Sequence, residues 1–428
     1  MYSPRGAGLL MIDRKRLVSW LLLIASLCLI YSWPLQVAYG DKIGYWIFAV
    51  ISAVILFLTK DARWSPVLSV YCLIITCVVV VQMAFISLPL QQAFQPLVLY
   101  LFVPFIYGRK IFDEDQLHWL LRALLICVPI NFIGTLLQLS GYNSVYLVLQ
   151  QTATLELLHD RYASFMGGVL SLGYVSMFNA ICSLYYLLMS NRKKDKILYG
   201  VLFVLAIFTL YFSFTRRFYV IFIIAAILMA IHRYNWRRVV ISLVAIISIT
   251  IVFNIVVVDN MSDKSYNVLF LDRFASTFDF SGGDEGNEYR ILKGIQAIDW
   301  SLTSPFLGLG VGSVGTIGKS IEELSENFDE AMIAETYYLH VAIDFGIFVA
   351  VYFLLFMLYL FYKSIIEFHI SGSIAALLLV LYPIDCIGSV ELAGPFPAVM
   401  FWLCMGVFFS GFFFMNNFNI GSNFEYKF

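Results

Sequence analysis

The chain has 428 residues, of which 61% are hydrophobic and only 13% are charged. A soluble globular protein carries about 25% charged residues, so this composition excludes an ordinary soluble domain and indicates an integral membrane protein. The formal net charge is −1, from 27 basic and 28 acidic residues, and this balance argues against nucleic acid as a partner.

Apolar runs of roughly 20 residues, the length that crosses a bilayer as a helix, recur along the whole chain. They predict an all-α polytopic fold with about twelve transmembrane helices in a single integral membrane domain, residues 1–428. The first run follows Arg14-Lys15-Arg16 and has no small-residue cleavage site, which indicates a retained helix. The predicted spans lie near 17–38, 43–59, 65–87, 94–108, 117–139, 164–190, 197–214, 217–232, 239–258, 334–362, 372–389 and 396–415.

Two polar segments separate these runs, a smaller one over residues 140–163 and a long one over 259–333, between the ninth and tenth spans. Lys and Arg concentrate in the other set of connections, for example 14–16, 109–110 and 192–196. Because basic residues favour the cytoplasmic side, both termini are expected in the cytoplasm and both polar segments outside it.

Cysteine and histidine give no sign of a metal site. All seven cysteines lie in apolar runs without a C-x-x-C pair, and no two histidines have ligand spacing on a helix. The sequence therefore predicts neither a bound metal nor a disulfide framework.

The stretch 305–320, PFLGLGVGSVGTIGKS, contains a G-x-G-x-x-G at Gly310, Gly312 and Gly315, as in dinucleotide-binding turns. Ser313 stands where a phosphate-binding P-loop ending in Gly318-Lys319-Ser320 needs its first glycine. No βαβ unit surrounds the stretch, and it is expected outside the cytoplasm. We therefore interpret the glycines as turn residues with positive φ.

Four arginines fall on the side that basic residues normally avoid: Arg161, the adjacent pair Arg216 and Arg217, and Arg290. Snorkelling to lipid headgroups is one interpretation. The other is capture of an anion, because guanidinium groups bind phosphate in a bidentate manner and several on one cavity would suit a diphosphate.

Carboxylates and tyrosines near the outer membrane surface are further candidates. Glu335, at the start of the tenth span, either pairs with an arginine or, with its pKa raised by desolvation, acts as a general base. Asp344 lies about half a helical turn away from the face of Glu335, so the two are not expected to form an acid/base pair. Tyr337 and Tyr338 either anchor the interface or stack on sugars. Asp385 and Glu391 are additional charges close to the membrane.

The order of these features resembles the O-antigen polymerases, integral membrane glycosyltransferases related to the O-antigen ligases. A long outer loop precedes the last three spans, and Asn287-Glu288-Tyr289-Arg290 precedes Pro305-Phe306-Leu307-Gly308-Leu309-Gly310-Val311-Gly312. Glu335-Thr336-Tyr337-Tyr338-Leu339 and Gly346-Ile347 then resemble the family's "E-S-x-x-L … G-I". Phe214-Thr215-Arg216-Arg217 is similar to its T-x-R, and Arg161 to an arginine before the preceding helix pair.

The resemblance implies a GT-C-like architecture in the bacterial inner membrane and no cofactor. Its implied substrates are oligosaccharide repeat units on undecaprenyl diphosphate, joined at the periplasmic face by metal-independent glycosyl transfer. Arg161, Arg216, Arg217 and Arg290 would bind the diphosphate, Arg290 and Glu335 would be catalytic, and Tyr337 and Tyr338 would contact sugar. The ligases have a histidine where this chain has Glu335, which favours a polymerase.

Two alternatives stay open from the sequence. One is the related O-antigen ligase, which transfers finished glycan to another acceptor. The other is a polytopic flippase or transporter for the same lipid-linked oligosaccharide, since about twelve spans suit it equally well. Besides membrane lipid and the lipid-linked substrate, a chain-length regulator and a flippase are conceivable partners of the polymerase.

Overall fold

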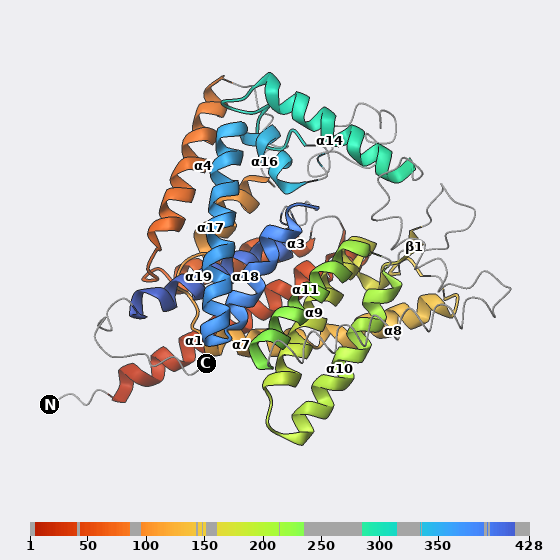
Figure 1. Ribbon diagram of the computed structural model, residues 1–428. Helices are drawn as coiled ribbons and strands as arrows, with labels where there is room; N and C mark the ends of the chain where they lie inside the picture. Colours follow the sequence, from red (N-terminus) through yellow and green to blue (C-terminus); the bar gives the residue numbers. More distant parts are fainter. Residues whose placement is uncertain are drawn as a thin grey trace.

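The described part of the chain folds as α-helices with one very small sheet (Figure 1). The computed structural model describes residues 5–40, 43–85, 96–142, 144–147, 149–150, 161–213, 215–234, 285–314, 334, 336–388, 392 and 394–415. Most buried apolar side chains of these residues belong to one continuous core cluster, and a second, small cluster lies beneath α14.

The N-terminal helices form a bent pair and two straight helices. α1 (Arg5–Ile30) and α2 (Ser32–Tyr39) meet at an angle of 75°. α3 (Ile43–Leu58) packs back on α1, where Gly44 allows close approach: a Cβ there would lie 3.0 Å from the carbonyl oxygen of Cys28. α4 (Pro66–Phe85) follows and stands beside α17 in Figure 1.

A run of short helices connects α4 to the centre of the chain. The turn before α7 is a capping box, in which the Asp113 carboxylate accepts from the Gln116 backbone N–H and the Gln116 side chain accepts from the Asp113 backbone N–H. The elements of this region are the π-helix η1 (Val98–Phe102), α6 (Val103–Tyr107), α7 (Glu114–Leu124), α8 (Cys127–Leu139), strands β1 (Leu149–Gln150) and β2 (Arg161–Tyr162), and the 3₁₀ turn η2 (Ser164–Met166).

Three antiparallel helices then pack together: α9 (Val169–Met189), α10 (Lys193–Phe212) and α11 (Arg216–Arg233). The α10–α11 connection is as tight as the sequence predicts. Phe218 of α11 fits against Gly173 of α9, where an added Cβ would meet the ring at 2.6 Å. A side chain at position 173 would therefore push the start of α11 away from α9.

The C-terminal helices complete the fold. In Figure 1, α14 runs across the ends of α4 and α17 instead of beside them, and α16 lies directly under it. α18 is buried along nearly its whole length. Their bounds are α14 (Glu285–Thr303), α16 (Tyr337–Phe345), α17 (Ile347–Ser371), α18 (Ile374–Asp385) and α19 (Pro395–Met415).

The apolar helices agree with a multi-pass membrane protein. Of the helices in the described residues, 5 are long and apolar enough to cross a membrane, and the bent α1–α2 pair would be a sixth. Shorter apolar helices cover 43–58, 98–107, 374–385 and 395–409, which are also predicted spans. The number of about twelve spans stays a prediction, and the span predicted near 239–258 lies outside the described residues.

Three predicted spans differ from the observed helices. The fifth, near 117–139, is interrupted at residues 125–126 between α7 and α8. The first, near 17–38, is divided at Tyr31 into α1 and α2. The tenth, near 334–362, is divided at Gly346 into α16 and α17, and α17 continues to Ser371. Gly346 has a φ of 92°, a conformation that ends a helix and that L-residues other than glycine rarely adopt. The long polar segment 259–333 contains α14, and the smaller one, 140–163, contains β1 and β2.

Candidate functional site

The first predicted site element is the arginine pair at the start of α11. Arg217 donates a hydrogen bond from Nη1 to the backbone carbonyl oxygen of Gly388, 3.2 Å away, and its Cζ lies 4.7 Å from the centre of the Phe218 ring. Gly388 belongs to the turn that follows α18. The guanidinium is therefore held between its own helix and the end of α18.

The backbones of Arg161 and Arg216 lie near the same end of the α9–α11 group. Arg216 is the first residue of α11, four positions after α10 ends at Phe212. Arg161 is in β2, paired with Gln150, and the ring of its neighbour Tyr162 meets the ring of Phe212 edge-on at 5.8 Å. Three of the four predicted arginines thus come from segments that meet at one end of three packed helices.

The second predicted element, the start of α16, is fixed to the same end of α18. The Tyr337 backbone N–H donates to the carbonyl oxygen of Cys386 at 3.1 Å, and the Tyr338 hydroxyl donates to that of Pro383 at 3.2 Å. Thr336 caps α16, its hydroxyl oxygen accepting from the Leu339 N–H. We call residues 383–388 the α18 turn. It joins the beginnings of α11 and α16, which are over a hundred residues apart in sequence.

The two predicted sugar-contacting tyrosines have different surroundings. Tyr337 is only 4% exposed, and its ring packs against Tyr100, His340 and Phe353. Tyr338 is half-buried. Of the two, Tyr338 has the surface that a sugar could reach, and sugar binding by either stays a prediction.

Glu335 lies outside the described residues, but both of its neighbours are described. Ala334, 3% exposed, packs with Ala297 of α14 and Ile343 of α16 in the small cluster beneath α14. Thr336 is the cap of α16 described above. Of the two sequence neighbours of Glu335, Ala334 thus packs beneath α14, and Thr336 caps the helix start that contacts the α18 turn. Arg290 is in α14, seven residues or two helical turns before Ala297.

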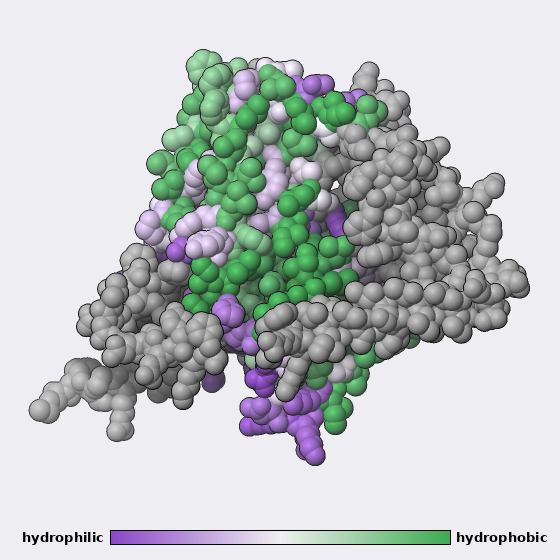
Figure 2. Space-filling model, viewed as in Figure 1, coloured by the Kyte–Doolittle hydropathy of each residue, from purple (hydrophilic) through white to green (hydrophobic). Residues whose placement is uncertain are grey.

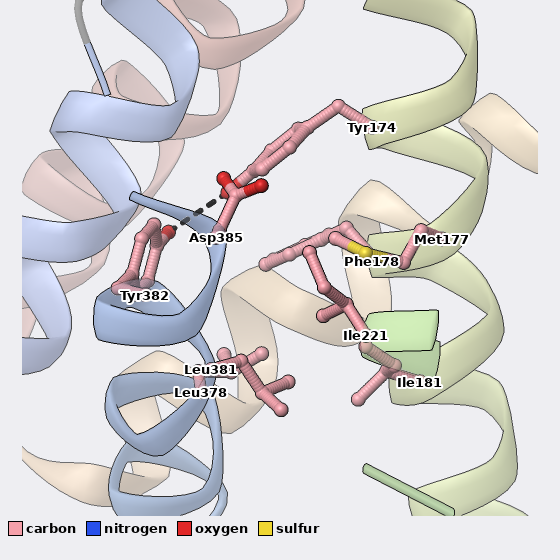
Figure 3. Close-up of a pocket in the computed structure, with 9 residues that line it drawn as sticks. All are labelled: Tyr174, Met177, Phe178, Ile181, Ile221, Leu378, Leu381, Tyr382 and Asp385. Carbon is pink, nitrogen blue, oxygen red and sulfur yellow. Dashed lines mark hydrogen bonds between the residues drawn. The ribbon is translucent and has the colours of Figure 1, made fainter. Parts of the chain in front are cut away.

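The α18 turn also carries a buried carboxylate. Asp385, 6% exposed, closes one end of a cavity of about 20 Å³ between α9, α11 and α18, room for about one water molecule (Figure 3). Figure 3 shows Asp385 beside Tyr174 and Tyr382, whose hydroxyls are joined by a hydrogen bond of 3.0 Å. Apolar side chains line the rest of the cavity, away from the carboxylate. Asp385 is one of the charges that the sequence places close to the membrane, and its position at this cavity is visible only in the fold.

The described part of the glycine stretch, residues 305–314, packs on the corner between α16 and α17. The Leu309 N–H donates to the Ile343 carbonyl at 2.7 Å, and the Ile347 N–H donates to that of Pro305 at 2.8 Å. Gly308 has a φ of 70°, and a Cβ there would lie 2.6 Å from the backbone carbonyl of Asp344. Residues 305–314 therefore cross the α16–α17 corner in close backbone contact, and we call this segment the crossing. Its glycines have the positive φ that the sequence predicts.

Beneath this crossing lies a buried polar group that the sequence did not reveal. His340 and Asp344, one turn apart on α16, have Nε2 and Oδ2 3.4 Å apart, and both are 0% exposed. The Gln82 amide on α4 donates to the carbonyl oxygens of Leu307 and Asp344. The only sequence signal is a lone Gln in an apolar run, because partners so distant in sequence are recognisable only in the fold.

Metal binding has no geometric support in the part of the chain that the structure describes, where no three His, Cys, Asp or Glu side chains form a ligand group. The arrangement instead brings the start of α11, which carries Arg217, and the start of α16, which follows Glu335 in sequence, together at the end of α18. Arginines can hold a phosphate group, and a carboxylate can accept a proton.

Comparison with known families gives one match. Residues 201–354 match the model of a family described as O-antigen ligase. The matched segment runs from α10 into α17 and includes Arg216, Arg217, Arg290 and Glu335, whereas Arg161 lies before it. Comparison with curated proteins finds no match.

Proposed function

We propose that this chain is an O-antigen polymerase, and the match of residues 201–354 to the family described as O-antigen ligase, whose members act on lipid-linked sugars, supports the proposal. It joins repeat units carried on undecaprenyl diphosphate, at the periplasmic face of a bacterial inner membrane. The observation that carries the proposal is the α18 turn, which brings the start of α11, with Arg217, beside the start of α16 at Tyr337, two residues after Glu335.

In the proposed reaction, a hydroxyl of the terminal sugar of one lipid-linked unit attacks the anomeric carbon of the growing chain. The bond between that carbon and the diphosphate oxygen breaks, and the new glycosidic bond forms. The hydroxyl proton passes to the Glu335 carboxylate. The electron pair of the broken bond leaves with undecaprenyl diphosphate, which gains one negative charge.

The arginines act on that departing charge. A guanidinium already held in place by protein contacts stabilises a developing anion without first having to be ordered. Arg217 is such a group, because Gly388 and Phe218 fix its position. Arg161, Arg216 and Arg290 are the further diphosphate ligands in this proposal.

The test uses the full chain reconstituted in vesicles with purified lipid-linked repeat units. We expect a ladder of products that grows by one repeat unit per step. Glu335→Gln should lower the initial rate about 100-fold or more, because it removes the general base. Glu367→Gln, near the C-terminal end of α17, is the matched control, and this variant should polymerise at the normal rate.

The family description itself favours a second candidate, an O-antigen ligase. The acceptor distinguishes the two. Glycan transfer to a lipid A core or a protein, with no ladder on the lipid carrier, would establish the ligase. Movement of the intact lipid-linked unit across the bilayer, with no new glycosidic bond, would overturn both in favour of a flippase.

A further inference from the structure

Helix α14 has three faces, and they follow from its sequence EGNEYRILKGIQAIDWSLT. One face is buried against the protein: Lys293, Ala297 and Ser301, four residues apart, are 2%, 0% and 4% exposed. Residues four apart lie on the same side of a helix. This side therefore packs on the body of the molecule, and α16 is among its neighbours.

A second face is apolar and exposed. Leu292, Ile295, Ile298 and Leu302 are 53%, 53%, 47% and 58% exposed. Their spacing of three and four residues places them in a single row, which we call the α14 stripe. Exposure of such a row of apolar side chains to water is unfavourable.

A third face, between the other two, is polar. Gln296, Asp299 and Thr303 follow one another at intervals of three and four residues, and the last two are exposed. A helix with one flank on protein, one apolar flank and one polar flank suits a position at a boundary between hydrocarbon and water.

The α14 stripe continues into the exposed apolar surface of α17. Phe306, just after α14, is 70% exposed and stacks at 5.0 Å on Phe348, which is 62% exposed and begins α17. α17 is one of the helices long and apolar enough to span a membrane, and its exposed Val351, Leu355 and Leu358 follow Phe348 along the helix. Figure 2 shows hydrophobic residues across the part of the surface that holds α4, α17 and α14.

We propose that α14 is an interfacial helix whose stripe lies in the hydrocarbon of the membrane surface, with its polar face toward water. The occupant of the stripe is lipid, because the stripe is continuous with the exposed apolar side of α17, a helix long and apolar enough to span a membrane. Since α14 runs across the ends of α4 and α17, its axis has the direction that an interfacial helix needs.

The placement has a consequence for the active site, and this consequence rests on the proposed function. Arg290 belongs to α14, so membrane contact along the stripe keeps the backbone of position 290 near the level of lipid headgroups. The diphosphate of a lipid-linked sugar lies at that level. α14 thus brings a candidate phosphate ligand to the depth of its substrate.

The test measures lipid contact directly and needs no enzymatic activity. A photoactivatable benzoylphenylalanine replaces Ile295, Ile298 or, as a matched control on the polar face of the same helix, Thr303. The full chain is placed in nanodiscs of phosphatidylethanolamine and phosphatidylglycerol, irradiated and analysed by mass spectrometry. We expect lipid adducts at positions 295 and 298 in at least fivefold excess over position 303.

Two outcomes would overturn the proposal: equal lipid labelling at all three positions, or no lipid labelling at 295 and 298. Chain-to-chain adducts at 295 and 298 in place of lipid adducts would likewise reject lipid as the occupant and assign the stripe to a second copy. Since none of these results depends on polymer synthesis, failure of the interfacial placement and failure of the proposed function are separately visible.

Discussion

The side-chain amide of Gln82, on α4, donates a hydrogen bond to the backbone carbonyl oxygen of Asp344, 2.7 Å away, although 262 positions separate the two residues. The same nitrogen donates to the carbonyl oxygen of Leu307 in the glycine stretch. One buried side chain thus ties together α4, the stretch that follows α14 and the end of α16.

Replacing Gln82 should therefore loosen three segments at once. Gln82→Met keeps the length of the side chain and removes the donor, which deprives two buried carbonyl groups of this partner. We expect the free energy of unfolding to fall by about 1–3 kcal/mol, measured by thermal denaturation in detergent. Met83→Leu, at the exposed neighbouring position, is the control and should leave the midpoint unchanged. An unchanged midpoint in Gln82→Met would show that the tie contributes nothing.

Gly308 and Gly141 allow two effects of glycine replacement to be separated. Both have positive φ, 70° and 78°, but only at Gly308 would a Cβ meet the backbone of Asp344, whereas at Gly141 nothing lies within 4 Å. Gly141→Ala should cost about 1 kcal/mol from backbone conformation alone. Gly308→Ala should cost about 1–3 kcal/mol more, because the crossing must shift. Equal melting temperatures for the two variants would contradict the tight fit of the glycine stretch.

Arg217 should contribute to catalysis through the planar shape of its guanidinium group as well as through its positive charge. In the polymerisation assay, Arg217→Ala should lower the rate roughly 100-fold, the usual effect of removing one donor to a developing anion. Arg217→Lys should be intermediate, because it restores the charge without the planar group. Arg233→Ala, at the opposite end of α11, changes the same residue type on the same helix and should have the normal rate. Equal losses in Arg217→Ala and Arg233→Ala would remove Arg217 from the site.

Asp113 should make stability depend on pH. Partial burial raises the pKa of its carboxyl, but the Lys15 ammonium, 2.9 Å away, and the backbone N–H of Gln116 outweigh burial and hold the pKa below its usual 3.8. Because the folded pKa is the lower one, this contribution is complete above the unfolded value and is lost as the pH falls through the folded value.

Asp113→Asn provides the comparison, since asparagine still caps α7 but has no charge. We expect wild type to melt at a higher temperature than the variant at neutral pH, and the difference to shrink as the pH falls below 3.8. A difference that stays constant over this range would mean that the charge of Asp113 contributes nothing.

Hydropathy located most helices because a membrane span must form its backbone hydrogen bonds within the helix and present apolar side chains to lipid. The length of an apolar run is therefore enough to identify it. The span predicted near 65–87 is α4, and the one near 197–214 is α10. The break at Gly346 was not predictable from hydropathy, because Phe345 and Ile347 on either side are apolar. The direction of the chain through the membrane stays a prediction.

Much less of the candidate site was accessible from the sequence. The rule that basic residues avoid the non-cytoplasmic side singled out Arg217 as unusual, and the structure places Arg217 against the α18 turn. It gave no indication that Tyr337 is enclosed by Tyr100, or that His340 and Asp344 form a buried pair. Such contacts depend on which helices meet, and spacing within one helix does not contain that information.

Several backbone donors in the described part of the glycine stretch, residues 305–314, are already engaged. Four of its N–H groups form hydrogen bonds within the protein: Gly308 to Ser304, Leu309 to Ile343, Ser313 to Gly310, and Val314 to the carboxylate of Asp344. A loop that cradles a phosphate must keep its N–H groups free for the anion. Any phosphate at residues 305–314 would compete with these four internal acceptors, so the glycine pattern that resembles a nucleotide loop instead fastens the chain after α14 to the α16–α17 corner.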